Sequence, residues 1–178
     1  MKQILLSGFG GQGVLFAGKF LCCAGILEGK EVSWLPSYGP EMRGGTCHCS
    51  VIISDETIGA PVVREPDVLI ALNEPSFNRF EAAVKPGGMM IADSGMLVSG
   101  IRSKRTDITS IYLEAAQTAA DNDMMGLGNL IILGKLLKET GIFKAETIEG
   151  AMKMAVPERN ESAMTGNNLK AIALGQTL

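Results

Sequence analysis

Short apolar runs alternate along the chain with longer segments whose apolar residues recur at helical spacing. The first run, at residues 4–6, is too short for a helix and has the length of a buried strand. After a glycine-rich stretch, apolar residues recur every three or four positions, at Val14, Leu15, Ala17, Phe20, Leu21, Ala24 and Leu27. The chain is therefore predicted to open with a strand, a tight turn and a helix that ends at Gly29.

The same two patterns divide the rest of the sequence. Strands are predicted at residues 31–35, 46–54, 68–72, 89–92 and 109–113, with residues 58–63 pairing with 46–54 as a hairpin. Helices are predicted at residues 73–84, 115–120, 129–140, 145–156 and 157–174. This alternation predicts an α/β fold: one domain over residues 1–178, three-layered and Rossmann-like, with a largely parallel sheet, helices on both faces and a helical carboxy-terminal end.

Composition and charge narrow the class of protein. The 178 residues are 46% hydrophobic, which is enough for one domain with a substantial core, and the net charge of −3 argues against a general nucleic-acid binder. No apolar stretch has the length of a membrane span, and the first residues enter a strand without a signal peptide. We therefore expect a cytoplasmic protein that binds neither nucleic acid nor membrane.

The four cysteines and the single histidine do not form a recognisable metal or cluster motif. Cys22 and Cys23 are neighbours on a predicted helix, whereas Cys47 and Cys49 flank His48 on a predicted strand and share the face opposite to it. There is no C-x-x-C pair and no iron–sulfur ligand run. We expect buried thiols, no bound metal and a structural His48. The alternatives are zinc held by Cys47, Cys49 and a remote cysteine, and a catalytic His48.

The turn between the first strand and the first helix carries the strongest signal for ligand binding. Gly8, Gly10 and Gly13 match the pattern G-x-G-x-x-G, and Gly11 and Gln12 complete the loop. Glycine keeps Cβ atoms away from a ligand, and the start of the helix presents unpaired N–H groups to a phosphate or carboxylate. These five residues are predicted to bind the anionic part of a cofactor. The alternative is that the glycines only let the helix pack closely on the sheet.

A second loop, at residues 36–45, is predicted to lie at the same edge of the sheet. It contains two prolines and three glycines, follows a strand, and carries Arg43, whose guanidinium can hold a phosphate or carboxylate. The alternative for Arg43 is a surface residue that closes a turn. A nicotinamide-binding unit also needs an acidic residue at the end of its second strand, and Glu28 and Glu31 come too early to supply it.

Five motifs that are spread over most of the chain occur together. They are the glycine loop at residues 8–14, the loop Tyr-Gly-Pro-Glu-Met-Arg-Gly-Gly-Thr at 38–46, Pro66-Asp67, Lys85-Pro86-Gly87-Gly88, and Asn-Leu-Ile-Ile-Leu-Gly at 129–134. In these motifs the chain resembles the gamma subunit of 2-oxoacid:ferredoxin oxidoreductases. Its loop at residues 39–43 is more similar to the 2-oxoglutarate and branched-chain members than to the pyruvate members. The related indolepyruvate enzymes carry a similar glycine loop.

The resemblance implies one subunit of a heteromeric enzyme that oxidatively decarboxylates a 2-oxoacid, transfers the acyl group to coenzyme A and reduces ferredoxin. It implies alpha, beta and ferredoxin-like delta subunits as partners. Thiamine diphosphate would lie between alpha and beta, and the iron–sulfur clusters would be held by cysteines that this chain lacks. This chain is then expected to bind no cofactor except coenzyme A, at the glycine loop and Arg43. Alone, it should have no catalytic residue and no activity. Its ten methionines and apolar carboxy-terminal half are compatible with self-association when the chain is isolated.

Two other functions stay open. The chain can be a stand-alone, Rossmann-type nucleotide-dependent reductase, although the missing acidic residue after the second strand counts against this function. It can also be an assembly module whose glycine loop binds no ligand. Titration with coenzyme A distinguishes an assembly module from a subunit that binds coenzyme A.

Overall fold

The computed structural model describes residues 1–39, 45–98, 100–157 and 161–178. In these residues six strands form one mixed sheet, in which β3 runs antiparallel to its two neighbours and the others point the same way. Across the sheet the strands are β2 (Glu31–Tyr38), β3 (Thr46–Ser54), β1 (Lys2–Phe9), β4 (Val68–Ala71), β5 (Met89–Asp93) and β6 (Thr109–Leu113). The prediction of a largely parallel sheet is confirmed.

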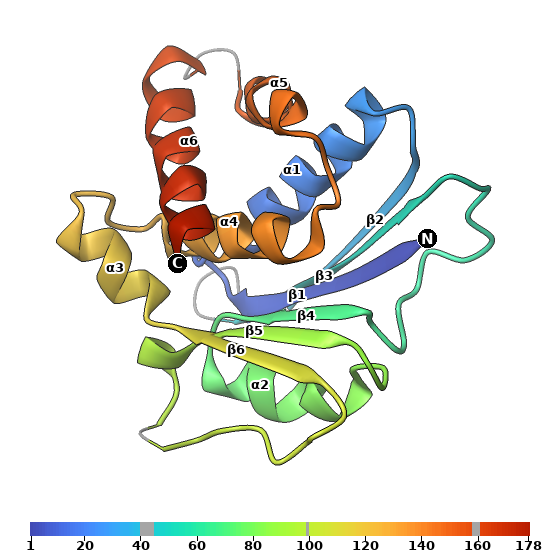
Figure 1. Ribbon diagram of the computed structural model, residues 1–178, viewed down its shortest axis with the longest axis vertical. Helices are drawn as coiled ribbons and strands as arrows, with labels where there is room; N and C mark the ends of the chain where they lie inside the picture. The colour runs from blue at the N-terminus through green and yellow to red at the C-terminus, as the bar shows by residue number, and fades with distance from the viewer. Residues whose placement is uncertain (40–44, 99, 158–160) are drawn as a thin grey trace.

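Helices cover both faces of the sheet, which confirms the three-layer prediction (Figure 1). One face carries α1 (Val14–Leu27), α4 (Gly128–Thr140), α5 (Ala145–Ala155) and α6 (Glu161–Thr177). The other face carries α2 (Glu74–Phe80), which continues into the short 3₁₀ helix η1 (Glu81–Ala83). The helix α3 (Ala115–Asp121) follows β6 at one end of the sheet, and the 3₁₀ helix η2 (Ser94–Met96) follows β5. The carboxy-terminal end is helical, as predicted.

Alternating side chains of β1 supply two separate cores. Ile4 and Leu6 pack into the larger core under α1, α4 and α6, whereas Leu5 packs into a smaller core with Phe77 of α2 and Met90 of β5. All three β1 side chains are buried, as expected for a central strand with helices on both faces. The glycine-rich turn therefore follows a strand that is buried on both faces.

The second strand is three residues longer than predicted. β2 runs from Glu31 to Tyr38, so that Pro36 lies inside the strand and not in the following loop. Pro36 is opposite Cys49 of β3, and among the described strands β2 has a neighbour on one side only. Proline is tolerated in such an edge strand because its missing N–H can face away from the ladder.

The predicted hairpin between residues 58–63 and 46–54 is wrong. Residues 58–63 form no strand. The reason is that β3 is already paired along both of its edges, with β1 over Thr46–Ile53 and with β2 over Cys47–Ser54, and has no edge to offer.

The helix predictions hold, with shifts of a few residues at their ends. α4 ends at Thr140, and Gly141 takes the left-handed conformation at φ 55° and caps the helix as predicted. The regular helix α2 stops at Phe80, four residues short of the predicted end, and α6 is assigned from Glu161 and extends to Thr177. No helix in the described part of the chain is long and apolar enough to cross a membrane.

Candidate functional site

The chain turns from β1 into α1 through two glycines in the left-handed region. Gly11 has φ 101°, and Gly13, the amino-terminal cap of α1, has φ 74°. A side chain at Gly13 would also collide with the amide of Asn129 from α4, whose Nδ2 donates a hydrogen bond to Gly13 O at 3.2 Å. The turn therefore brings the starts of α1 and α4 together, and only glycine fits at position 13.

The side chain of Gln12 holds this turn against the neighbouring strand. Its Oε1 accepts hydrogen bonds from Phe9 N–H at 2.6 Å and from Asn73 Nδ2 at 3.0 Å. Its Nε2 donates to Leu72 O at 2.9 Å. Gln12 therefore links the ends of β1 and β4, a supporting role in the loop that its place in the motif does not reveal.

Two backbone N–H groups of the loop are available to a ligand. Gly10 N–H donates to Gly45 O at 2.9 Å and Gln12 N–H donates to Phe9 O at 3.1 Å. Within the described residues nothing accepts a hydrogen bond from the N–H of Gly11 or Gly13. The first turn of α1 contains no acidic side chain, so its partial positive charge is not neutralised there. The loop can therefore donate to an anion.

A cavity of about 250 Å³ opens beside this loop, at the carboxyl ends of β1, β4 and β5. Gly11 and Gln12 form one side, Gly128 and Asn129 at the start of α4 form another, and Asp93 lies at the end of β5. The chain passes from β1 into α1 and from β4 into α2, and these two helices lie on opposite faces of the sheet. The cavity lies where the two connections diverge. In open α/β sheets this is where ligands bind.

Asp93 is a lining residue that the sequence motifs did not single out. It is 4% exposed, and its carboxylate accepts N–H hydrogen bonds from Gly95 at 3.2 Å, Ala115 at 3.2 Å and Ala116 at 3.1 Å. Burial raises the pKa of Asp93 above its ordinary value although these N–H groups act in the opposite direction. Asp93 fixes the start of α3 and, with it, one wall of the cavity.

The position of β2 differs from that in a nicotinamide-binding unit. There the second strand lies beside the first, and an acidic residue at its end reaches the ribose. Here β3 lies between β1 and β2, so that β2 is two strand spacings, about 10 Å, from β1. The strand also ends in Tyr38 and not in an acid. The structure therefore argues against a dinucleotide reductase for a second, independent reason.

His48 lies on the opposite face of β3 from the two flanking cysteines, as predicted. The His48 ring packs against the Phe80 ring with a centroid distance of 5.4 Å. The guanidinium of Arg79 lies 5.0 Å from the centre of the Phe80 ring. Burial, together with the charge of Arg79, lowers the pKa of His48. This packing favours the structural interpretation of His48 over a catalytic one.

The cysteines are buried free thiols. Burial raises the pKa of Cys22 and of Cys49 to about 12, and Cys49 Sγ donates to Val14 O at 3.6 Å. Such thiols are poor nucleophiles because the thiolate is the reactive form. In the described ranges no group of three or more histidine, cysteine, aspartate or glutamate side chains is placed to hold a metal ion.

Arg43, the sixth predicted binding residue, lies outside the described residues. One described end of its loop contacts the glycine turn, and the two ends are bonded to each other. Gly45 O accepts the hydrogen bond from Gly10 N–H, and Gly39 N–H donates to Thr46 O at 3.3 Å. The described end of the loop at Gly45 therefore lies beside the glycine turn, which keeps Arg43 in the proposal below.

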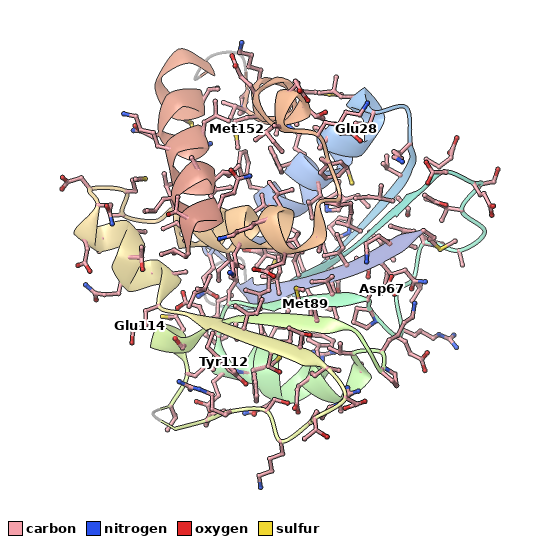
Figure 2. All side chains as sticks on the ribbon, in the orientation of Figure 1. Glu28, Asp67, Met89, Tyr112, Glu114 and Met152 are labelled. Carbon is pink, nitrogen blue, oxygen red and sulfur yellow. The ribbon has the colours of Figure 1, made fainter. Side chains whose placement is uncertain are left out.

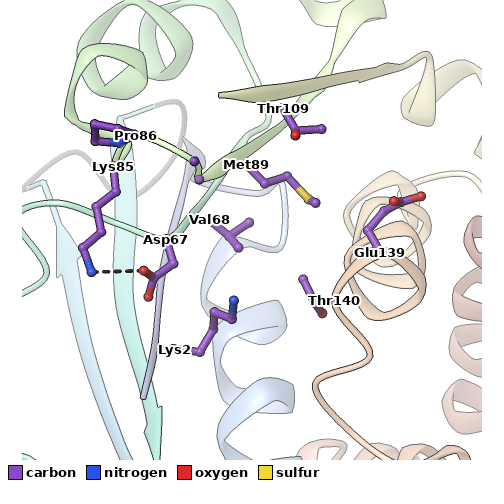
Figure 3. Close-up of a pocket in the computed structure, with 11 residues that line it drawn as sticks. Lys2, Asp67, Val68, Lys85, Pro86, Met89, Thr109, Glu139 and Thr140 are labelled. Carbon is purple, nitrogen blue, oxygen red and sulfur yellow. Dashed lines mark hydrogen bonds and ion pairs between the residues drawn. The ribbon is translucent and has the colours of Figure 1, made fainter. Parts of the chain in front are cut away.

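Two of the remaining sequence motifs, Pro66-Asp67 and Lys85-Pro86-Gly87-Gly88, meet at the end of the sheet where β4 and β5 begin, opposite to the glycine turn. Asp67 accepts hydrogen bonds from Gln3 N–H at 2.6 Å and from Lys85 Nζ at 3.0 Å, next to a second cavity of about 280 Å³ (Figure 3). Asp67 O also accepts from Met89 N–H at 2.9 Å. These contacts fasten the starts of β1, β4 and β5 to one another, so the two motifs have a structural explanation.

Residues 3–178 match the family model for pyruvate ferredoxin/flavodoxin oxidoreductases. The chain is 35% identical over 176 residues to the 2-oxoglutarate synthase subunit KorC of Methanocaldococcus jannaschii, covering 98% of this chain and 91% of the relative. It is 39% identical over 135 residues to the ketoisovalerate oxidoreductase subunit VorA of Methanothermobacter marburgensis. That alignment covers 76% of this chain and 28% of the relative, which is therefore much longer.

Two solved structures share the fold. The gamma subunit of a keto/oxoacid ferredoxin oxidoreductase from Geobacter sulfurreducens superposes with a TM-score of 0.80 at 30% identity, covering 98% of this chain and 96% of that one. The 2-oxoglutarate:ferredoxin oxidoreductase of Magnetococcus marinus, solved with 2-oxoglutarate, coenzyme A and succinyl-CoA bound, gives a TM-score of 0.87 at 21% identity. There the match covers 99% of this chain and 30% of the longer one.

Proposed function

The chain belongs to the pyruvate ferredoxin/flavodoxin oxidoreductase family, and we propose that it is the gamma-type subunit of a heteromeric 2-oxoacid:ferredoxin oxidoreductase. The complete enzyme would oxidatively decarboxylate a 2-oxoacid, form the acyl-CoA and reduce ferredoxin. The alignment with KorC over nearly the whole of both chains supports this proposal. Within the enzyme, the chain would help to bind coenzyme A.

The observation that carries the coenzyme A assignment is the pair of available N–H groups at Gly11 and Gly13. They lie where α1 begins, and backbone donors combined with the helix dipole suit a phosphate group. Coenzyme A is the substrate of the proposed reaction that carries phosphates. Arg43 is included as a second anion contact from the adjoining loop, because a guanidinium can pair with two phosphate oxygens.

The described residues of this chain support a role in binding and not in bond making. His48 packs against Phe80 with its ring tilted, and the thiols of Cys22 and Cys49 are held protonated by burial. The decarboxylation and electron transfer are therefore assigned to the proposed alpha, beta and ferredoxin-like delta subunits, with thiamine diphosphate and iron–sulfur clusters. The proposal includes a cytoplasmic location, which the four free thiols favour.

One observation is expected of the second candidate, an assembly module that binds no ligand. Trp34, Leu35 and Tyr38 of the edge strand β2 are 39%, 39% and 40% exposed. Large apolar side chains on a sheet edge are typical of a surface that another chain covers. A subunit needs such a surface whether or not it binds coenzyme A, so this observation is compatible with both candidates.

Coenzyme A titration of the assembled complex distinguishes the two candidates. Gly11→Ala places a methyl group in the space through which a phosphate would approach, and Gly29→Ala is its matched control. Both glycines have positive φ, and a Cβ at either would meet no atom within 4 Å. We expect Gly11→Ala, and Arg43→Ala likewise, to raise the Kd for coenzyme A about tenfold to hundredfold, since a hydrogen bond to a charged group contributes about 1.5–3 kcal/mol. Unchanged affinity in both variants would favour the assembly module.

The purified chain alone should have no oxidoreductase activity. The assay uses a 2-oxoacid, coenzyme A and a viologen acceptor, and the co-purified complex is the positive control. Robust turnover by the isolated chain would contradict the assignment of the chemistry to partner subunits.

A further inference from the structure

A smaller cavity, of about 160 Å³, lies on the other side of the start of α1. It adjoins the first cavity, because Gly126 and Asn129 line both and the neighbours Gln12 and Gly13 line one each. The small cavity lies among α1, the start of α4 and α6. The side chains in its lining are Phe16, Leu127, Leu130, Met164, Asn129 and Asn168.

The two cavities differ in charge. Four of the six side chains in the small cavity are apolar and two are amides, and none of the described lining residues carries a charge. The lining of the first cavity includes the acidic residue Asp93 and also Gly11, whose N–H has no acceptor among the described residues. Beyond Gly13, the side chains of the small cavity offer no charge to a charged group that would lose its hydration there, so this lining favours a neutral occupant.

Asn168 gives the small cavity a buried polar group without a strong partner. The residue is 3% exposed, and its Nδ2 donates only to the thioether sulfur of Met152 on α5, at 3.5 Å. Figure 2 labels Met152 between α5 and α6. No described residue donates a hydrogen bond to Asn168 Oδ1. A thioether is a weak acceptor, and buried amides normally have full hydrogen-bond partners. Asn168 can therefore bind a ligand amide.

We propose that the small cavity binds part of the neutral, amide-containing pantetheine arm of coenzyme A, with Asn168 hydrogen-bonded to an amide of that arm. The phosphates then lie at the glycine loop. This inference rests on the proposed function, because it assumes that coenzyme A is the ligand. The volume corresponds to about five waters at about 30 Å³ each. The cavity therefore takes a segment of the arm around one amide, and the thiol end extends beyond it.

The test compares two ligands on the assembled complex by calorimetry. One is coenzyme A, and the other is adenosine 3′,5′-bisphosphate, which has the charged end without the arm. Asn168→Leu keeps the size of the side chain and removes both amide groups, and the fold loses only a thioether contact. We expect it to raise the Kd for coenzyme A about threefold to tenfold, the effect of one neutral hydrogen bond, and to leave the Kd for the bisphosphate unchanged. Asn167→Leu, on the exposed side of α6, should change neither.

A second variant, Met164→Trp, tests the same cavity in case Asn168→Leu does not fold. Met164 is 41% exposed at the rim, so Met164→Trp can fill the cavity without disturbing the core, and it should give the same selective loss of coenzyme A binding. If both variants leave coenzyme A binding unchanged, or weaken both ligands equally, the inference is overturned and the glycine-loop proposal stands. If the wild-type complex binds neither ligand, both are overturned.

Discussion

The crossing of α4 and α6 depends on two glycines, and its stability can be tested by adding one methyl group. A Cβ at Gly134 of α4 would overlap the carbonyl oxygen of Ile172, and a Cβ at Gly175 of α6 would overlap the carbonyl oxygen of Ile131. Both carbonyl oxygens are backbone atoms within helices, so neither can move aside as a side chain does when it changes its rotamer. Gly134→Ala must therefore push the two helices apart.

The expected loss can be worked from two opposing effects. Overpacking a core costs about 1–3 kcal/mol, and a collision with backbone belongs at the upper end of that range. Alanine recovers about 1 kcal/mol because it favours a helix over glycine. The net loss is about 2 kcal/mol. For a chain of this length, 1 kcal/mol shifts the melting temperature by about 2–4 °C, so Gly134→Ala should lower it by about 4–8 °C.

Thermal unfolding of Gly134→Ala and Gly166→Ala, monitored by circular dichroism, tests this reasoning. Gly166 also lies in α6, but it is exposed, and a Cβ there would meet no atom within 4 Å. Gly166→Ala should therefore raise the melting temperature by about 2–4 °C through helix propensity alone. A Gly134→Ala variant as stable as Gly166→Ala would refute the close crossing.

Three further predictions concern single side chains. Gln12→Ala removes three hydrogen bonds, one with Phe9 N–H at the end of β1 and two with Leu72 and Asn73 after β4. It should lower the free energy of unfolding in urea by about 2–4 kcal/mol, and a loss below about 1 kcal/mol would contradict its linking role. Burial raises the pKa of Glu28, but hydrogen bonds from Lys144 N–H and Thr147 Oγ1 outweigh it and hold the pKa below its ordinary value of 4.5. The stability that Glu28 contributes is therefore present above about pH 4.5 and is lost as the pH falls through the lower folded-state value, so Glu28→Gln should flatten this acid limb in melts at a series of pH values. Burial raises the pKa of Cys49 to about 12, so a thiol reagent at pH 8 should label it only after unfolding, and fast labelling of the native protein would disprove its burial.

The local parts of the fold could be predicted from the sequence. The apolar run at residues 68–72, the glycine after α4 and the spacing of apolar residues after Gly13 each depend on a few neighbouring positions. The pairing of β3 could not be predicted in the same way. The strands that pair with a given strand can be distant from it in sequence. One edge of β3 pairs with β1, which precedes it by about forty residues. The hairpin with residues 58–63 failed for that reason.

The same limit applies to the candidate site. The glycine pattern identified the turn, because it follows from local backbone geometry. Of the predicted binding residues in this loop, Gly10 and Gln12 use their N–H groups within the fold, whereas Gly11 and Gly13 do not. The pattern did not identify Asp93 or Asn168 as lining residues, since they come from β5 and α6 and carry no local motif. It also did not reveal the role of Gln12, whose partners Leu72 and Asn73 lie sixty residues away.

The position of β3 bears on the ligand proposed for the glycine loop. It places Thr46 opposite Phe9, beside the loop, where a nicotinamide-binding unit has the end of its second strand and a ribose-binding acid. On the other side, Asn129 Nδ2 donates a hydrogen bond to Gly13 O, and both residues line the small cavity together with Asn168. Backbone donors, amides and apolar side chains therefore surround the start of α1, and the acidic Asp93 lies across the first cavity, engaged by three N–H groups. This set favours a phosphate that continues into a neutral arm over a second nucleotide, and for that reason a sequence pattern shared with dinucleotide-binding proteins is compatible with a coenzyme A site here.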